Sequence, residues 1–224
     1  MSGEHLFGLI GEHLGHSYSR EIHSLLTEDA YSYELIELIP DSVEPFLAAR
    51  AFAGINVTIP YKQTVMPFLD EISPEAQAIG CVNTIINHDC RLTGYNTDSA
   101  GFEFLTRRSG IDFARKKVLI LGSGGTSLTA QAAVRAAGAR ELVVMSRRGS
   151  VTYADIPQHR DAEIIVNTTS VGMFPKNGER LLTLADFPDC HGVIDVIYNP
   201  MRTALLLEAE ERGIPHGNGL PMLV

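Results

Sequence analysis

Residues 118–127 read Val-Leu-Ile-Leu-Gly-Ser-Gly-Gly-Thr-Ser, and this stretch indicates the class of fold in the second half of the chain. The apolar run predicts a buried strand, the glycines a tight turn, and the alanine-rich stretch 128–137 a helix. In this order the parts place backbone amides where they can hold a pyrophosphate. Ser127, at the third position of the G-x-G-x-x-G pattern, is small enough for close helix packing. Over the alternative of a merely tight strand-to-helix turn, we predict a dinucleotide site formed by Gly122, Ser123, Gly124, Gly125 and Thr126.

The end of the next predicted strand indicates which dinucleotide is bound. A site that selects NAD usually places an acid there, against the adenosine ribose. This chain has Ser146, Arg147 and Arg148 instead. Two guanidinium groups suit a 2′-phosphate, so the pattern favours NADP, although paired loop arginines are more often solvated surface charges.

Strand-like apolar runs alternate with helical periodicity along the chain, which predicts an α/β fold with mostly parallel sheets. In the first half we expect strands at 6–10, 33–38 and 54–58, helices at 19–26 and 42–49, and a hairpin of 83–87 with 91–95. Asp41 and Ser42 are candidates to cap the helix at 42–49. In the second half we expect helices at 98–107, 128–137 and 203–212 and strands at 118–121, 142–145, 163–167 and 193–197. The connection 150–161 is too short for a full strand-flanking helix, so this half is predicted to be an abbreviated nucleotide-binding domain.

Composition excludes several classes of protein. The formal net charge of -9 argues against a general affinity for nucleic acid or anionic membranes. The three cysteines form no CxxC pair and are expected to be reduced thiols of a cytoplasmic protein. No signal-peptide pattern is present, and no apolar run approaches the ~20 residues of a membrane span.

Two charged residues stand where chemistry is plausible. Lys62 follows the buried strand at 54–58, at a sheet edge where α/β proteins bind ligands. A desolvated lysine can exchange protons near neutral pH, yet most lysines after strands are surface charges. Asp98 ends one strand and opens a helix, where a helix cap is the simpler role.

The loop after the first strand contains paired hydroxyl groups. Ser17 and Ser19 alternate with Tyr18, so both hydroxyls can donate to one carboxylate, although Ser19 in particular could instead cap the following helix. His13, His16 and His23 have no carboxylate or cysteine partner at ligand spacing, so no metal site is predicted.

Together these motifs, in their order, resemble the shikimate dehydrogenase family across nearly the whole chain. The resemblance is carried by Gly8–Gly11 with His16–Ser19, Asn56–Lys62, Cys81–Thr84, Gly94–Asp98, Gly122–Gly125, Asn167–Met173, Asp195–Pro200 and Gly219–Val224. It implies a substrate-binding domain at 1–98, to which 219–224 return, and a Rossmann-like NADP domain at 99–218, with a cleft between them. It further implies a monomer or homodimer that reversibly reduces 3-dehydroshikimate to shikimate in aromatic amino acid (chorismate) biosynthesis.

The resemblance also implies roles for particular residues. Lys62 and Asp98 would form the catalytic pair, in which Lys62 supplies a proton to the carbonyl oxygen while Asp98 orients both the lysine and the substrate hydroxyl. Ser17 and Ser19 would hold the substrate carboxylate. The ring substituents would be contacted by Thr58, Asn83 and Tyr198. The nicotinamide side of the cofactor site would be lined by Val196 and Gly219, and Ser146 takes the place of a usual family asparagine.

The chain departs from the family pattern in three ways. Arg20 replaces a proline that commonly follows the paired serines, and the region 148–163 is shorter than usual. The family usually continues beyond Val224 into Ala-Gln and a helix, so a truncated chain or part of a larger fused protein is expected. Two alternatives remain open: an NAD-dependent dehydrogenase of quinate or an aminated analogue, and an inactive ligand-binding remnant.

Overall fold

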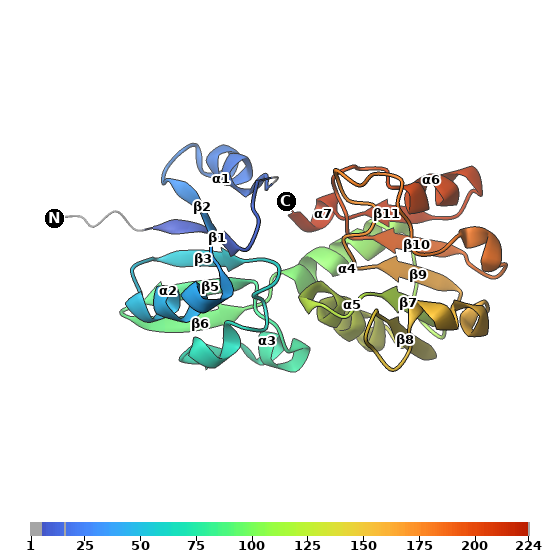
Figure 1. The fold of residues 1–224 in the computed structure, drawn as a ribbon, viewed down its shortest axis with the longest axis horizontal. Coiled ribbons are helices and arrows are strands. Elements are labelled where there is room, and N and C mark those ends of the chain that lie inside the picture. Colours follow the sequence, from blue (N-terminus) through green and yellow to red (C-terminus); the bar gives the residue numbers. More distant parts are fainter. Residues whose placement is uncertain (1–5, 16, 224) are drawn as a thin grey trace. The chain divides into compact units, whose positions relative to one another are not determined.

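The computed structural model describes residues 6–15 and 17–223, and the chain divides into two compact units, Met1–Thr97 and Asp98–Val224 (Figure 1). Each unit is built on one sheet with helices beside it, so the predicted α/β class is confirmed. His16 of the paired-hydroxyl loop and Val224 of the segment 219–224 lie outside the described residues.

The sheet of the first unit has six strands in the order β2-β1-β3-β5-β6-β4. Their bounds are β1 Phe7–Gly11, β2 Tyr33–Glu37, β3 Gly54–Val57, β4 Glu71–Ile72, β5 Thr84–His88 and β6 Arg91–Tyr95. β1 pairs in parallel with β2 and β3, whereas β5 is antiparallel to β3 and β6. The predicted hairpin is therefore confirmed as β5–β6, and both of its turn residues, Asp89 and Cys90, have positive φ.

Helices of the first unit lie on both faces of its sheet. They are α1 Ser19–Thr27, α2 Val43–Ala49 and α3 Pro74–Ile79, with 3-10 turns η1 Pro40–Ser42 and η2 Met66–Phe68. Val43 and Leu47 of α2 join Ile10, Ile55 and Val57 of the strands in one buried core. α1 buries no residue fully.

The capping predicted for this unit is wrong. Ser42 precedes α2 but makes no capping hydrogen bond, because it lies in η1 with helical φ and ψ rather than the extended conformation that a capping residue needs. Asp41 is likewise inside η1. Ser19 is already the first residue of α1, which follows Tyr18 without a side-chain cap.

The sheet of the second unit is wholly parallel, in the order β11-β10-β9-β7-β8. Its strands are β7 Lys117–Leu121, β8 Glu141–Met145, β9 Ile164–Asn167, β10 Gly192–Asp195 and β11 His216–Asn218. The helices are α4 Asp98–Ser109, α5 Gly125–Ala136, α6 Ala204–Glu211 and α7 Leu220–Leu223, with 3-10 helices η3 Tyr153–His159 and η4 Leu184–Asp186.

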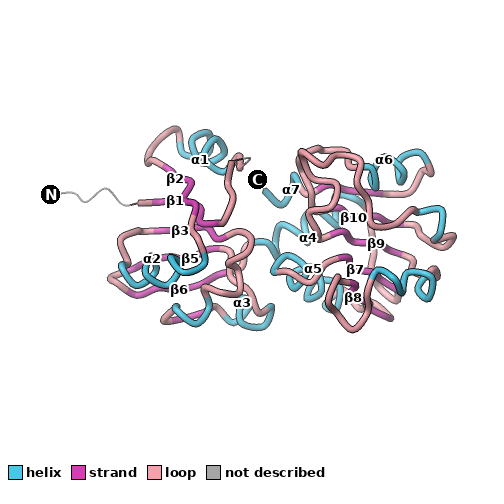
Figure 2. The backbone as a smooth tube through the Cα atoms, in the orientation of Figure 1, coloured by secondary structure: helices cyan, strands magenta, loops and turns pink. Residues whose placement is uncertain are grey.

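Both faces of this sheet are covered, as in a doubly wound fold. On one face Val118 and Ile120 of β7 pack with α4 and α5, and on the other Leu119 and Leu121 pack with α6 and η4. The tube in Figure 2 shows that only the short helix η3 interrupts the loop between β8 and β9. The abbreviated connection predicted at 150–161 is therefore observed.

The last described segment packs within the second unit. α7 lies on α4, where a Cβ atom on Gly101 would come within 3.1 Å of the Cα atom of Met222. Residues 219–223 therefore pack on α4 of the second unit, whereas the family resemblance implies that 219–224 return to the first domain. No helix within the described ranges is both long and apolar enough to cross a bilayer.

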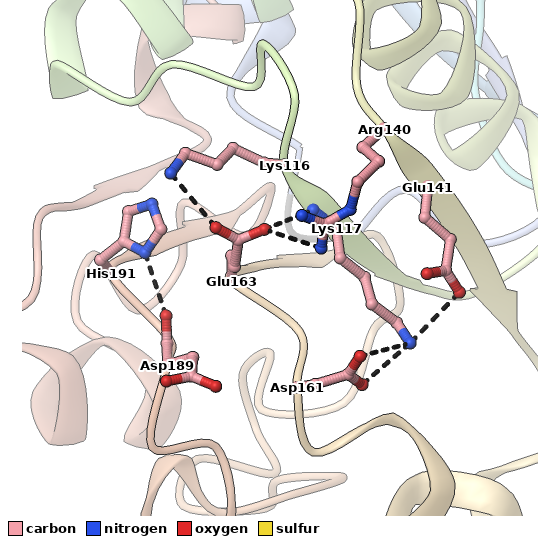
Figure 3. Close-up of polar contacts among 8 residues, drawn as sticks. All are labelled: Lys116, Lys117, Arg140, Glu141, Asp161, Glu163, Asp189 and His191. Carbon is pink, nitrogen blue, oxygen red and sulfur yellow. Dashed lines mark hydrogen bonds and ion pairs between the residues drawn. The ribbon is translucent and has the colours of Figure 1, made fainter.

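Charged side chains gather where β7, β8 and β9 begin, at the edge opposite to the glycine turn (Figure 3). The Nζ atom of Lys117 lies 2.8 Å from Asp161 and 3.2 Å from Glu141, and its side chain is only 7% exposed. Burial opposes the charge of Lys117, but hydrogen bonds and attraction from the two carboxylates outweigh it and raise the pKa. Glu163 accepts a hydrogen bond from the Lys117 backbone N–H and pairs with Lys116. This cluster ties three strands together.

Candidate active-site residues in the two units

Strands β1 and β3 end at the same edge of the first sheet. The segments that follow these two strands contain predicted substrate residues. The Thr58 N–H donates to the Ile10 carbonyl oxygen at 2.9 Å. A Cβ atom on Gly11 would lie 2.7 Å from Cγ2 of Thr58, so the two strand ends touch. The loop that follows β1 and the segment Thr58–Lys62 therefore start side by side.

Ser17 and Ser19 present adjacent hydroxyl groups. The Ser17 hydroxyl donates to the Ser19 hydroxyl at 3.1 Å and accepts from the Ser19 N–H at 3.2 Å. Arg20, in place of the usual proline, donates from Nε to the Tyr33 carbonyl oxygen at 3.0 Å and so ties α1 to β2. Two neighbouring hydroxyls suit joint donation to one carboxylate.

Lys62 and Asn83 are held near each other by backbone hydrogen bonds. The Lys62 carbonyl oxygen accepts from the Val82 N–H at 2.8 Å, and the Asn83 carbonyl oxygen accepts from the Val57 N–H at 2.7 Å. Lys62 is half-buried and Asn83 is 8% exposed. The structure therefore groups Thr58, Lys62 and Asn83 where β3 ends and β5 begins.

A directed chain of hydrogen bonds orients the Asn83 amide. The Tyr33 hydroxyl donates to Asn56 Oδ1 at 2.6 Å, Asn56 Nδ2 donates to Thr84 Oγ1 at 3.1 Å, and Thr84 donates to Asn83 Oδ1 at 3.0 Å. The Thr97 N–H donates to the same oxygen at 2.9 Å. Burial raises the pKa of Tyr33, which keeps its hydroxyl a donor. Sequence reasoning gave Tyr33, Asn56 and Thr84 no role, since their contacts cross three strands.

Asp98 opens the second unit as the first residue of α4, and it is half-buried. As the first residue of α4, it lies one position inside the helix from the cap considered for it.

The glycine turn fits a dinucleotide pyrophosphate. Gly122 has φ of 107°, and a Cβ atom there would lie 2.7 Å from Thr168 Oγ1, so only glycine suits the position. A Cβ atom on Gly124 would meet nothing within 4 Å, which leaves space in front of the turn. The buried Ser127 hydroxyl donates to the Gly122 carbonyl oxygen at 2.7 Å and braces the turn. Exposed Ser123 lies beside the start of α5, whose N-terminal amides attract phosphate.

Ser146, Arg147 and Arg148 follow β8, as the sequence predicts. Ser146 is buried and its N–H donates to the Val151 carbonyl oxygen at 3.1 Å, whereas both arginines are exposed. Burial raises the pKa of the Tyr153 hydroxyl, and the charge of Arg147 acts in the opposite direction. The charge of Arg147 therefore acts on the Tyr153 hydroxyl, and the exposed Arg147 side chain remains accessible to an anion.

Val196, Tyr198 and Gly219 come together after β10 and β11. The Gly219 N–H donates to the Ile197 carbonyl oxygen at 3.0 Å. A Cβ atom on Gly219 would lie 1.8 Å from the Val196 carbonyl oxygen, so the two backbones make direct contact. Val196 and Tyr198 are half-buried.

Sequence reasoning gave no role to Asp195, the residue before this segment, although it opens the motif Asp195–Pro200. It is 0% exposed, and no lysine, arginine or histidine in the described parts of the chain forms an ion pair with it. Burial raises the pKa of its carboxyl group to about 6, although Thr203, the Ile197 N–H and Asn167 all donate to it. An acid that ends an otherwise apolar buried strand is the sequence signal that could have identified it.

Known proteins with similar sequences and structures fall in one family. Residues 9–85 match the model of the shikimate dehydrogenase substrate binding domain. The chain is 39% identical over 249 residues to shikimate dehydrogenase (NADP(+)) of Geobacillus kaustophilus. The matched region covers 99% of this chain and 89% of that protein.

Solved structures agree with the sequence relatives. Shikimate dehydrogenase 1 from Peptoclostridium difficile superposes with a TM-score of 0.91 at 34% identity, covering 98% of this chain and 87% of that one. Shikimate 5-dehydrogenase from Thermus thermophilus, solved in complex with NADP(H) and shikimate, has a TM-score of 0.86 at 33% identity, with 98% and 88% covered. The chain therefore belongs to the shikimate dehydrogenase family.

Proposed function

We propose that this protein is an NADP-dependent shikimate dehydrogenase, which reversibly reduces 3-dehydroshikimate to shikimate in aromatic amino acid biosynthesis. The observation that carries the proposal is the grouping of Thr58, Lys62 and Asn83 at one edge of the first sheet, where the loop with the paired hydroxyls also begins. The Thermus thermophilus relative, which binds NADP(H) and shikimate together, supports the same pair of ligands.

The two units divide the work in this proposal. The first binds the substrate within residues 1–98, and the second binds NADP within residues 99–218, with 219–224 completing the site. The protein acts on its small-molecule substrate in the cytoplasm as a monomer or homodimer. Light scattering after size-exclusion chromatography distinguishes the two oligomeric states.

Residues of the second unit hold NADP. Gly122, Ser123, Gly124, Gly125 and Thr126 surround the pyrophosphate, because their turn leaves space and directs amides toward it. Arg147 and Arg148 bind the 2′-phosphate with Ser146 at their base. Val196 and Gly219 line the nicotinamide. When bound, the cofactor supplies the hydride.

Residues of the first unit hold and protonate the substrate. Ser17 and Ser19 donate to its carboxylate, and Thr58 and Asn83, with Tyr198 of the second unit, contact its ring substituents. During reduction the carbonyl oxygen gains negative charge, and Lys62 donates a proton to it. Asp98 accepts a hydrogen bond from the same hydroxyl group and orients Lys62. In the oxidation direction Lys62 receives that proton.

Turnover of shikimate with NADP tests the proposal directly. The absorbance of the reduced cofactor is followed for the wild-type protein, for Lys62→Ala and for Lys176→Ala, which removes an exposed lysine outside the proposed site. We expect Lys62→Ala to lower kcat by ~10² or more, as loss of a proton donor does, and Lys176→Ala to leave it unchanged.

Two results would refute the proposal. One is a folded wild-type protein that binds both ligands without turnover. The other comes from a panel in which shikimate and quinate are each tested with NADP and NAD. A kcat/KM for quinate above that for shikimate would assign the enzyme to the quinate branch.

A further inference from the structure

We propose that Asp195 is a positioning residue for the segment Val196–Tyr198 and acts through the backbone N–H of Ile197. The inference deepens the proposed function, on which it rests, because Val196 and Tyr198 are the nicotinamide and substrate contacts assigned above. Asp195 itself touches neither ligand in this account.

The Asp195 carboxylate joins the loop that directly follows it to two other segments, which contain Thr203 and the more distant Asn167. Its Oδ1 atom accepts from the Ile197 N–H at 3.1 Å and from Asn167 Nδ2 at 3.1 Å. Its Oδ2 atom accepts from the Thr203 hydroxyl at 2.7 Å. These donors come from the loop after β10, the end of β9 and the residue that caps α6. One buried group therefore fixes the relative positions of all three.

Asn167 extends this network toward the glycine turn. Its Oδ1 atom accepts from the Thr169 hydroxyl at 2.7 Å and from the Thr169 N–H at 3.1 Å. The neighbouring Thr168 hydroxyl donates to the Leu121 carbonyl oxygen at 2.7 Å, beside Gly122. These hydrogen bonds therefore fix the position of the loop after β10 relative to the glycine turn, which holds the pyrophosphate in the proposed function.

Two backbone hydrogen bonds also restrain the segment Val196–Tyr198, but neither uses the Ile197 N–H. The Val196 N–H donates to the Asn167 carbonyl oxygen at 3.0 Å, and the Ile197 carbonyl oxygen accepts from Gly219 at 3.0 Å. Ile197 is 4% exposed, so removal of the Asp195 carboxylate leaves a buried N–H without its acceptor. A buried donor without a partner is costly, and the backbone would shift to find one.

Such a shift matters for hydride transfer. A displacement of the reacting groups by about 1 Å lowers the rate of the chemical step by as much as ~10²-fold. Because Gly219 already contacts the Val196 backbone, a displaced Val196 would also disturb the second side of the proposed nicotinamide site.

The test separates the nicotinamide end of the cofactor from the adenosine end. Isothermal titration measures the binding of NADP and of 2′,5′-ADP, which lacks nicotinamide, to wild type, Asp195→Ala, Asp195→Asn and Glu208→Ala. Glu208 is a matched control: it is a buried acid of the same unit whose carboxylate accepts from Arg180, Thr183 and Ala185, in and before η4.

We expect Asp195→Ala to raise the Kd of NADP roughly tenfold and to keep the Kd of 2′,5′-ADP within about twofold of the wild-type value. We also expect kcat to fall by ~10-fold or more. Asp195→Asn should stay within about threefold of wild type for both ligands, since an amide oxygen can still accept from Ile197 and Asn167 while its NH₂ group donates to Thr203. Glu208→Ala should lower stability without this selective loss of NADP.

Three results would overturn the inference. Asp195→Ala could weaken NADP and 2′,5′-ADP equally, Glu208→Ala could reproduce its selectivity, or Asp195→Asn could be as impaired as Asp195→Ala, which would assign the effect to charge. A wild-type protein that binds NADP without oxidising shikimate would refute the proposed function alone, because the binding comparison would still test Asp195.

Discussion

The carboxyl group of Asp195 shows how burial and hydrogen bonding compete at one residue. Burial raises its pKa, and the three donors lower it, yet the balance remains at about 6. An exposed aspartate in the unfolded chain titrates near ~3.9. A folded pKa above the unfolded one stabilises the protein below the unfolded value, and this contribution is lost as the pH rises through the folded value.

We therefore predict that Asp195 makes wild-type stability depend on pH between the two values. The free energy of unfolding of wild type minus that of Asp195→Asn should fall by about 2 kcal/mol between pH 4 and pH 7, because the amide does not titrate. Urea denaturation at several pH values measures the difference. A difference that is constant over this range would contradict the raised pKa.

At the scale of single elements, the β5–β6 hairpin contains strain that the sequence does not reveal. Asp89 and Cys90 have φ of 51° and 60°, as a two-residue type I′ turn requires. Cysteine tolerates this conformation less well than glycine.

Cys90→Gly should raise the free energy of unfolding by about 1 kcal/mol, since it relieves the left-handed conformation at the second turn position. Cys90→Ala is the control, because alanine keeps the Cβ atom and should give no comparable gain. Urea denaturation measures both variants. An equal gain from Cys90→Ala would show that the thiol, and not the backbone conformation, is responsible.

The charged cluster at the beginning of β7, β8 and β9 has a structural role in our interpretation. Lys117→Ala should lower the free energy of unfolding by about 2 kcal/mol, because it removes a buried stem and leaves Asp161 and Glu141 without their shared cation. The KM for NADP should not change, since the glycine turn lies at the other end of β7.

Lys116→Ala provides the comparison for this prediction. Lys116 is more exposed and pairs with Glu163, so its removal should cost less than about 1 kcal/mol. Chemical denaturation and steady-state kinetics give the two readouts. Equal losses for both variants, or a raised KM for NADP in Lys117→Ala, would rule out the assigned role.

Across the whole molecule, elements with a local sequence signal were predictable and the two shortest strands were not. The strand at 118–121, the glycine turn and the hairpin have local signals, and each is confirmed. β4 and β11 are two and three residues long and owe their existence to the strands beside them, so no local pattern marks them. The capping expected of Ser42 failed because a 3-10 turn precedes α2.

The candidate site follows the same rule. Lys62 and Asn83 could be proposed from the sequence because each lies in a continuous motif. The chain from Tyr33 through Asn56 and Thr84 to Asn83 could not, because it depends on β2, β3 and β5 taking their places in the strand order. That order is a tertiary property, set by helices and loops far from the residues it brings together.

The division of binding between the two units makes a prediction for the whole chain. Ligands that bind the native state slow amide exchange, by about 100-fold for globally exchanging amides at a concentration of 100 Kd. NADP alone should protect residues 122–128, 146–148 and 196–198. The nucleotide 2′,5′-ADP, which lacks nicotinamide, should protect the first two segments but not 196–198. Shikimate alone should protect residues 17–20 and 82–85.

Hydrogen exchange followed by mass spectrometry of peptides resolves these segments. Because the unliganded protein sets each baseline, the comparison does not depend on turnover. Protection of 122–128 by shikimate, with none at 17–20, would show that the substrate binds the second unit and would reverse the proposed division.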